Sequence, residues 1–299
     1  MRIFQVDAFT NTRYTGNPAT VVLDADGQDD ATLMAIAREF PHAEAAFVFA
    51  ADAPTHDVRV RFYNARKEAP FVGHATIAAH AVLLAAGRRG LGVCRQMSGT
   101  GILDVAVHAH PTGADPGGAL IEFRQSVPEL GNPLPLKTTL RVAEALRLPG
   151  ARLHDTLPAR LATKGGTRLL LPIADAEGLA MIEPNFGTLA ALGAELGADG
   201  FFVFAHRAAP DDGSTDSRMF CPALGIPEDP VSGNAHAMLA TYLWQDGRLA
   251  GRPSFTGRQG LKMRRPGEVR VTAEIERGEL LAVRIAGRAV IVSEGTLAA

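Results

Sequence analysis

Two helical segments that are apolar on every side constrain the fold of this chain more than any other feature. They lie in Pro70–Leu84 and Pro230–Leu243, and each follows a short loop that contains a glycine, Gly73 or Gly233. A helix without a polar face must be surrounded by protein, so each segment predicts a sheet wrapped around a central helix.

The two helices belong to a longer duplication. Ala46–Phe49 resembles Phe201–Phe204, and Arg61–Tyr63 resembles Met219–Cys221, in the same order and at nearly constant spacing. This order favours two copies of one unit over the alternative, chance similarity between apolar strands. We therefore expect an α+β fold of two pseudo-symmetric domains, each a curved, mostly antiparallel sheet rolled around its apolar helix.

The domain boundary is expected at the proline-rich segment Pro128–Pro135, interpreted as a linker. This places an N-terminal domain at residues 1–127 and a C-terminal domain at 128–299. A strand near Ala282–Val292 can return to complete the sheet of the N-terminal domain. With 299 residues, each half is long enough to bury a core of its own.

Composition excludes several classes of partner. The chain has 30 basic and 32 acidic residues and no basic stripe interleaved with aromatics, so we expect no nucleic acid. Its longest apolar run, Ala75–Gly87, is too short to cross a bilayer, and no signal segment opens the chain. Cys94 and Cys221 lack metal or redox spacing, which predicts reduced thiols in a cytoplasmic protein and no metal site.

The starts of the two apolar helices are suited to bind an anion. The first N–H groups of a helix have no partner within it, and the macrodipole adds partial positive charge there. A glycine lets a ligand approach this backbone closely. If the two starts face each other, they form a cleft suited to a small carboxylate.

Three ionisable residues could carry chemistry beside these helix starts. Glu44 is the only ionisable residue between Ala43 and Ala51, and such apolar surroundings are expected to raise its pKa. Each of the three also has an ordinary explanation: a solvated glutamate at a strand start for Glu44, a first-turn histidine for His74, a capping aspartate for Asp229. Their convergence on one cleft favours the functional interpretation.

With these residues assembled, the chain resembles the PhzF-like phenazine-biosynthesis isomerases, which share the diaminopimelate epimerase fold. The resemblance covers nearly the whole length. It rests on four motifs: VDAFTNTRYTGNPATVVL at the start, MAIAREF…EAAFVF around Glu44, EAPFVGHATIAAH around His74, and DSRMFCPALGIPEDPVSGNAHAML around Asp229. Together these motifs are highly specific.

The resemblance implies a homodimer that works without metal or organic cofactor on a small carboxylic acid. In the family's characterised isomerase, the glutamate matching Glu44 moves a proton between carbons of trans-2,3-dihydro-3-hydroxyanthranilate. Residues matching His74 and Asp229 line the same pocket and help to position the substrate. A single carboxylate that acts as base and then as acid on one ligand face predicts isomerisation.

Four further residues are expected to bind the substrate: Gly73, Ser232, Gly233 and Asn234. The resemblance implies that the two glycines place backbone N–H groups near the ligand carboxylate. A serine commonly follows the second glycine in the phenazine enzyme, whereas Asn234 stands here, and the segment between Phe62 and Pro70 is one residue longer than usual. Both departures bear on the choice of substrate.

Two other functions stay open. The first is an amino-acid epimerase or racemase with Glu44 and Asp229 as opposed groups. Related enzymes of that kind use a cysteine at each helix start, and Val72 and Ser232 occupy those positions here, which disfavours a two-thiol mechanism. The second is a non-catalytic protein that binds small molecules.

Overall fold

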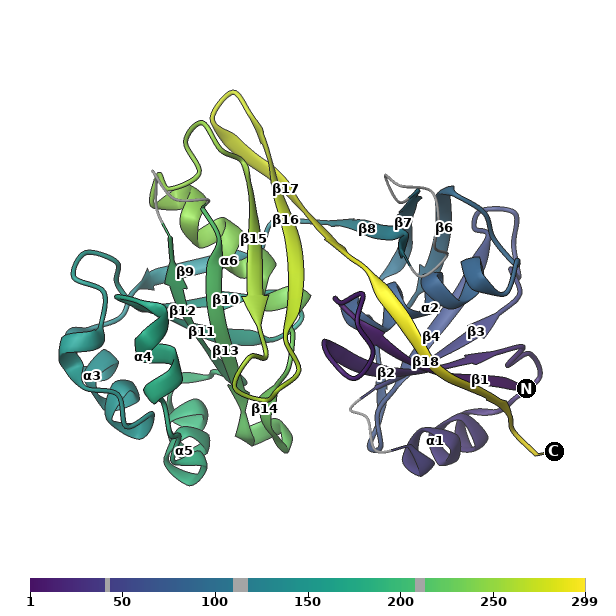
Figure 1. The fold of residues 1–299 in the computed structure, drawn as a ribbon, viewed down its shortest axis with the longest axis horizontal. Helices are drawn as coiled ribbons and strands as arrows, with labels where there is room; N and C mark the ends of the chain where they lie inside the picture. Colours follow the sequence, from purple (N-terminus) through teal and green to yellow (C-terminus); the bar gives the residue numbers. More distant parts are fainter. Residues whose placement is uncertain (41–43, 110–117, 208–212, 299) are drawn as a thin grey trace. The chain divides into compact units, whose positions relative to one another are not determined.

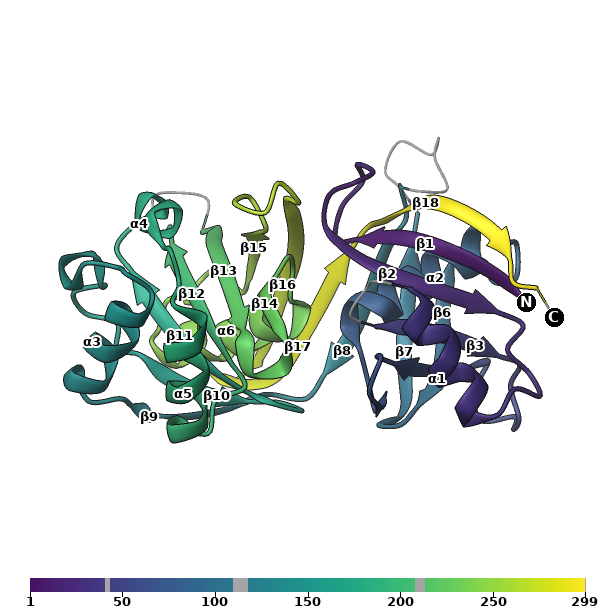
Figure 2. The same ribbon diagram turned by 90° about the horizontal axis from the view of Figure 1, so that it is seen from below.

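The computed structural model describes residues 1–40, 44–109, 118–207 and 213–298. These residues form two compact units, one built from 1–124 with 286–299 and the other from 125–285 (Figures 1 and 2). Among the described residues, no helix combines the length and the apolar character needed to cross a membrane.

The first unit is a sheet around helix α2 (Gly73–Ala85), with helix α1 (Asp30–Glu39) packed on its other face. Its strands are β1 (Arg2–Ala8), β2 (Asn17–Leu23), β3 (Ala45–Phe49), β4 (Val58–Tyr63), β5 (Glu68–Ala69), β6 (Gly92–Ser98), β7 (Gly101–His108), β8 (Leu120–Gln125) and β18 (Ala289–Thr296). Helix α2 contacts β1, β2, β3 and β18, and every residue from Ala75 to Leu83 is buried. The segment is apolar on every side because strands surround it, as expected.

The second unit repeats this plan around helix α6 (Gly233–Gln245), which is buried from Ala235 to Leu243. Its strands are β9 (Glu129–Pro133), β10 (Arg160–Thr163), β11 (Thr167–Ile173), β12 (Gly200–His206), β13 (Thr215–Cys221), β14 (Ile226–Asp229), β15 (Ser254–Gln259), β16 (Gly267–Glu276) and β17 (Glu279–Gly287). Its other helices are α3 (Leu136–Ala145), α4 (Ala176–Met181) and α5 (Phe186–Leu196), with short 3₁₀ turns at Gly150–Arg152 and Pro222–Leu224. Residues of α3, α4 and α5 share one core cluster with strands β11, β12 and β13.

The strand pairings show that the two units have one topology. In the first unit, β1 and β2 are antiparallel, β2 and β3 parallel, β3 and β4 antiparallel, β4 and β6 parallel, and β6 and β7 antiparallel. The same series runs through β10, β11, β12, β13, β15 and β16 in the second unit. In both units a short strand, β5 or β14, pairs with the preceding long strand and leads into the central helix. The predicted α+β fold class is confirmed.

The strand register proposed for the duplication is wrong by one residue. Ala45 and Tyr63 belong to the core that includes residues of α1, and Phe201 and Phe220 belong to the core that includes residues of α3, α4 and α5. Ala45 therefore corresponds to Phe201, whereas the sequence comparison assigned that place to Ala46. Strands β3 and β12 are apolar on both faces, so the alternation that normally fixes register is missing there.

The segment Pro128–Pro135, expected as a linker, contains strand β9 instead. Residues 129–133 pair antiparallel with β10, with an irregularity in the register between Arg160 and Ala162. Proline and glycine are tolerated in edge strands and at bulges, so this composition did not distinguish a linker from such a strand. The chain returns at the other end, where β18 pairs with β1 in the first unit.

Candidate functional site

Glu44 and His74 come together at the start of α2. Glu44 lies immediately before β3, and His74 is the second residue of α2. Glu44 Oε2 is 3.6 Å from His74 Nε2, and the two side chains are only 20% and 12% exposed. A carboxylate and an imidazole therefore share a partly buried position beside the N-terminus of the helix, where both could exchange protons with a ligand.

The backbone at the start of α2 is positioned by the strands that precede it. Arg61 on β4 binds Glu68 on β5 through two hydrogen bonds of 2.8 and 2.7 Å, which fixes the short strand that leads to the helix. Val72, the residue before the helix, is extended, and its apolar side chain supplies no cap for the N–H groups of the first turn. The helix dipole adds partial positive charge at this end.

Gly73 also has a packing reason to be glycine. A Cβ atom there would lie 3.2 Å from Phe123 Cζ, closer than nearly all real Cβ contacts. The Phe123 ring packs edge-to-face against Phe71, with ring centroids 5.3 Å apart. The absence of a side chain at this position therefore serves the core of the unit as well as access to the backbone.

In the second unit, Asp229 ends β14 and Ser232 caps α6. Ser232 Oγ accepts a hydrogen bond of 3.3 Å from the N–H of Ala235. On the other side of the short loop, the partly buried Asp229 precedes the helix by four residues. The two helix starts differ chemically, because α6 has a polar cap where α2 has Val72.

A buried glutamine that sequence reasoning missed holds the loop between Asp229 and Ser232. Gln259 Nε2 donates to the Asp229 carbonyl at 2.6 Å, and Gln259 Oε1 accepts from the Ser232 N–H at 3.1 Å. The next residue, Gly260, has φ +85°, and a Cβ there would lie 2.8 Å from the Pro230 carbonyl oxygen. Gln259 and Gly260 are distant from the loop in sequence, so no local motif indicated them.

Replacing Gln259 with methionine, which has a similar shape, should lower the free energy of unfolding by about 2 kcal/mol. The loss arises because the Ser232 N–H and the Asp229 carbonyl would each lose a partner inside the protein. Urea unfolding at pH 7 measures it. Gln245 is exposed, and the matched change Gln245→Met should stay within about 0.5 kcal/mol. Equal losses in the two variants would show that the Gln259 amide does not hold the loop.

A buried ion pair fixes the strand that carries Asp229. The Arg218 guanidinium binds Glu228 through two hydrogen bonds of 2.8 Å and donates to the carbonyls of Leu179 and Ile182 at 2.9 and 2.8 Å. Four hydrogen bonds thus stabilise its buried charge. Each unit therefore uses an arginine–glutamate pair to place the strand before its central helix.

The side chain of Asn234 takes part in the structure of its own unit. Asn234 Nδ2 donates to the Lys164 carbonyl at 2.8 Å, in the turn between β10 and β11. A serine hydroxyl is shorter than an asparagine amide, so the residue at this position also decides whether the turn is held.

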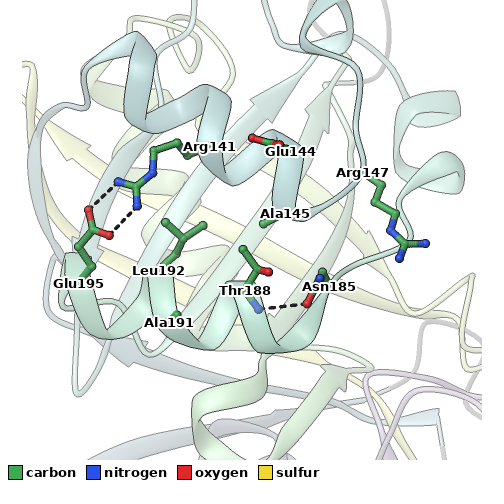
Figure 3. A pocket seen from close by; sticks show the side chains of 9 residues that line it. All are labelled: Arg141, Glu144, Ala145, Arg147, Asn185, Thr188, Ala191, Leu192 and Glu195. Carbon is green, nitrogen blue, oxygen red and sulfur yellow. Dashed lines mark hydrogen bonds and ion pairs between the residues drawn. The ribbon is translucent and has the colours of Figure 1, made fainter.

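A pocket of about 390 Å³ lies in the second unit between α3 and α5 (Figure 3). Its lining includes Arg141, which forms two hydrogen bonds of 2.6 Å with Glu195, and Asn185, which caps α5. It contains none of the site residues expected from the sequence. Because its bidentate pair is already satisfied, this pocket has no evident role in proton transfer.

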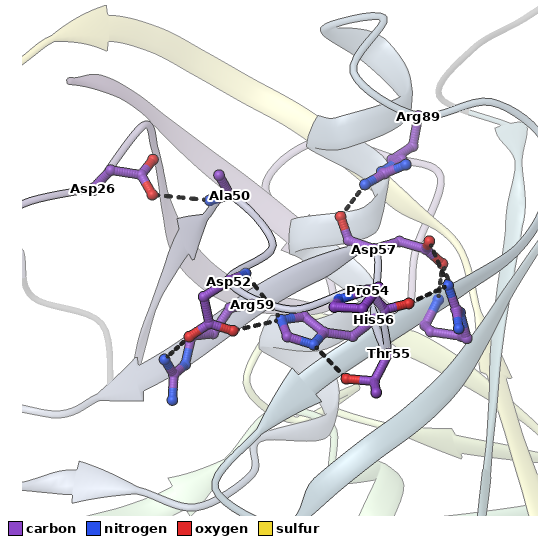
Figure 4. A network of polar contacts seen from close by, with 10 residues as sticks. Asp26, Ala50, Asp52, Pro54, Thr55, His56, Asp57, Arg59 and Arg89 are labelled. Atoms are coloured by element: carbon purple, nitrogen blue, oxygen red, sulfur yellow. Dashed lines mark hydrogen bonds and ion pairs between the residues drawn. The ribbon is translucent and has the colours of Figure 1, made fainter.

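A polar network in the first unit ties the start of β4 to its neighbours (Figure 4). His56 Nε2 lies 2.9 Å from Asp52 Oδ1, and Asp57 accepts hydrogen bonds from the Arg95 backbone and side chain at 2.8 and 3.1 Å. The Arg95 bonds lower the pKa of Asp57 to about 2. Since Arg89 also binds the Asp57 carbonyl, the network braces strands rather than forming a site.

The two cysteines are buried thiols, and burial raises the pKa of Cys94. Neither lies at the start of a central helix, because Cys94 is in β6 and Cys221 ends β13. Among the residues that the structure describes, no three His, Cys, Asp or Glu side chains are grouped so as to hold a metal ion.

Comparison with known proteins identifies the family of the chain. The family model described as "Phenazine biosynthesis-like protein" matches residues 6–295. The uncharacterized isomerase YddE of Escherichia coli O157:H7 is 35% identical over 97% of this chain and 96% of its own, and an uncharacterized isomerase of Clostridium acetobutylicum is 31% identical over 99% and 97%.

Solved structures share the fold of the chain. A PhzF-family protein of Bacillus anthracis superposes with a TM-score of 0.87 at 25% identity, covering 100% of this chain and 99% of the other. A hydroxyproline epimerase of Agrobacterium vitis shares the fold, with a TM-score of 0.65 at 13% identity over 99% and 91%. The expected enzyme class, isomerase, is confirmed, and the chain belongs to the phenazine biosynthesis-like (PhzC-PhzF) family.

Proposed function

We propose that this protein is an isomerase that moves a proton within a small cyclic or amino-substituted carboxylic acid, with Glu44 as acid and base and with no metal or organic cofactor. The observation that carries the proposal is the pair at the start of α2, where Glu44 Oε2 lies 3.6 Å from His74 Nε2 in a partly buried position. The sequence family supports the reaction class.

The chemistry follows from the groups at the helix starts. A carbon next to a carboxylate and an unsaturated system loses a proton only if the developing anion is stabilised. Backbone donors at the starts of α2 and α6 are suited to that stabilisation, typically worth several kcal/mol in a water-poor site. Glu44 would take the proton and return it to another carbon on the same face, with His74 and Asp229 positioning the substrate. The product then has a transposed double bond.

The substrate is proposed to resemble trans-2,3-dihydro-3-hydroxyanthranilate, with its carboxylate on the backbone near Gly73 and Gly233 and with Ser232 and Asn234 beside it. Asn234 donates one amide hydrogen to the Lys164 carbonyl, so its second amide hydrogen or its amide oxygen would contact a ligand. We further propose a homodimer in the cytoplasm, as the family resemblance implies.

Incubation with trans-2,3-dihydro-3-hydroxyanthranilate in deuterated water tests the proposal. A product with a moved double bond, detected by absorbance and NMR, is the expected result. Deuterium incorporated at one carbon with inversion, and no transposition, would instead indicate an epimerase with Glu44 and Asp229 as opposed groups. Tight binding of 3-hydroxyanthranilate with neither exchange nor turnover of any tested acid would indicate a non-catalytic binding protein.

A further inference from the structure

We propose that Gly99 is a positioning residue, whose contact with Pro70 fixes the loop that holds His74 beside Glu44. Gly99 is the first residue of the turn between β6 and β7, and Pro70 opens the loop between β5 and α2. The proposal rests on the proposed function, because it concerns the Glu44–His74 pair. It adds a residue that lies outside the sequence motifs around that pair.

The backbone of Gly99 packs directly on the backbone of Pro70. A Cβ atom at residue 99 would lie 2.8 Å from Pro70 Cα and 3.1 Å from the Pro70 carbonyl oxygen. Both of these are backbone atoms, so a change of side-chain rotamer at Pro70 cannot relieve the contact. Any side chain at residue 99 must therefore displace either the turn or the loop.

The conformation of the turn does not itself require glycine at this position. The φ angle of Gly99 lies outside the left-handed region, whereas Gly101, at the other end of the turn, has φ +97°. Gly99 is also exposed. An exposed residue with an ordinary backbone conformation normally accepts a side chain, so the contact with Pro70 is what excludes one here.

The loop would yield more readily than the turn. Ser98 and Gly101 pair at the end of the β6–β7 ladder, and the hydroxyl groups of Ser98 and Thr100 are 3.1 Å apart. Residues 70–72 belong to no strand or helix. A side chain at residue 99 would thus push Pro70 and the residues that follow it.

The loop residues after Pro70 are closely packed, so they would pass such a displacement on. The Phe71 ring packs edge-to-face against Phe62, with centroids 6.0 Å apart, and against Phe123. Gly73 in turn lies against Phe123. Close-packed groups yield little, so a shift of Pro70 is expected to reach His74, four residues later.

The second unit has the same contact with a different backbone conformation. Gly260 directly follows β15, as Gly99 directly follows β6, and it lies against the carbonyl of Pro230. Pro70 and Pro230 each stand three residues before the central helix. Gly260 has φ +85° and Gly99 does not, so close approach to the proline, and not one backbone conformation, is the feature that the two positions share.

The test compares Gly99→Ala with Gly90→Ala, which adds the same methyl group at an exposed glycine with no heavy atom within 4 Å of the new Cβ. NMR spectra of the imidazole nitrogens, with the His74 signals identified by their loss in His74→Gln, report the position of His74 without a ligand. Gly99→Ala should shift these signals. It should also lower kcat for trans-2,3-dihydro-3-hydroxyanthranilate by about tenfold and change KM by less than about threefold, because a small misplacement of reacting groups affects the transition state more than binding. Gly90→Ala should change neither.

Unchanged His74 signals in Gly99→Ala would overturn the proposal, and so would equal losses of kcat in the two variants. A crystal structure of Gly99→Ala in which Glu44 Oε2 and His74 Nε2 are still 3.6 Å apart would also overturn it. Wild-type protein that turns over none of the tested acids would instead overturn the proposed function. The NMR comparison and the crystal structure would then still decide whether Gly99 positions His74.

Discussion

Glu44→Gln should abolish turnover of trans-2,3-dihydro-3-hydroxyanthranilate, lowering kcat by at least about 10³-fold. The amide has nearly the same shape as the carboxylate but cannot take a proton from carbon. Its position beside His74 would be kept, so the dissociation constant of 3-hydroxyanthranilate should change by less than about tenfold, or ~1.4 kcal/mol. Absorbance assays give the rate, and calorimetry gives the affinity.

Glu39→Gln is the matched control, because Glu39 is exposed at the end of α1 and should leave kcat unchanged. Full activity in Glu44→Gln would remove Glu44 from the proton transfer. A large loss of affinity with unchanged kcat would make Glu44 a binding group instead. The two outcomes separate chemistry from binding because the substitution removes the basic oxygen and little else.

The parts of the fold that could be predicted from the sequence depend on local patterns. The apolar segments after Gly73 and Gly233 form helices that begin at those glycines and are buried along most of their length, as expected. A helix that is apolar on every side must be buried in protein, so a sheet wrapped around each helix could be predicted. The proximity of Glu44 and His74 follows from the motifs around them, which came with the family resemblance.

The features that could not be predicted depend on contacts between distant segments. Gln259 holds the loop before α6 from a strand that follows this helix in the chain, and a glutamine at a strand end has no special pattern. The register of β3 and β12 was missed because both faces of these strands are apolar. The strand at Glu129–Pro133 was missed because its partner, β10, lies well downstream.

Lowering the pH from about 6.5 to about 4 should destabilise the protein strongly, because His80 and His236 are buried in neutral form. Burial lowers the pKa of both to about 4, from an ordinary value of 6.5. His80 Nε2 donates to Gln96 Oε1 at 3.0 Å, and its Nδ1 has no partner among the described residues that could stabilise a second proton.

The direction of this pH effect depends on whether the folded or the unfolded state binds more protons. Between pH 6.5 and 4 the unfolded chain protonates both imidazoles and the folded protein does not, so stability is full above pH 6.5 and falls as the pH drops toward 4. Each of these two pKa shifts corresponds to about 3 kcal/mol of the free energy of unfolding. Together they lower it by about 6 kcal/mol, a large share of the stability of an ordinary domain. Burial also lowers the pKa of His154 and His206, which adds to the same trend.

Urea unfolding at pH 7.5, 5.5 and 4.5 measures this loss before most carboxylates titrate. Asp57, held near pKa 2 by Arg95, loses its contribution only below about pH 4, and its exposure keeps that contribution small. His80→Asn should remove about half of the pH dependence above pH 4.5, because one of the two protons taken up on unfolding is gone. His108→Gln, a change at a half-exposed side chain, should leave it intact. A stability that is the same at pH 7.5 and 4.5 would mean that the buried imidazoles are solvated or paired when protonated, and the packing described for both central helices would then have to be wrong.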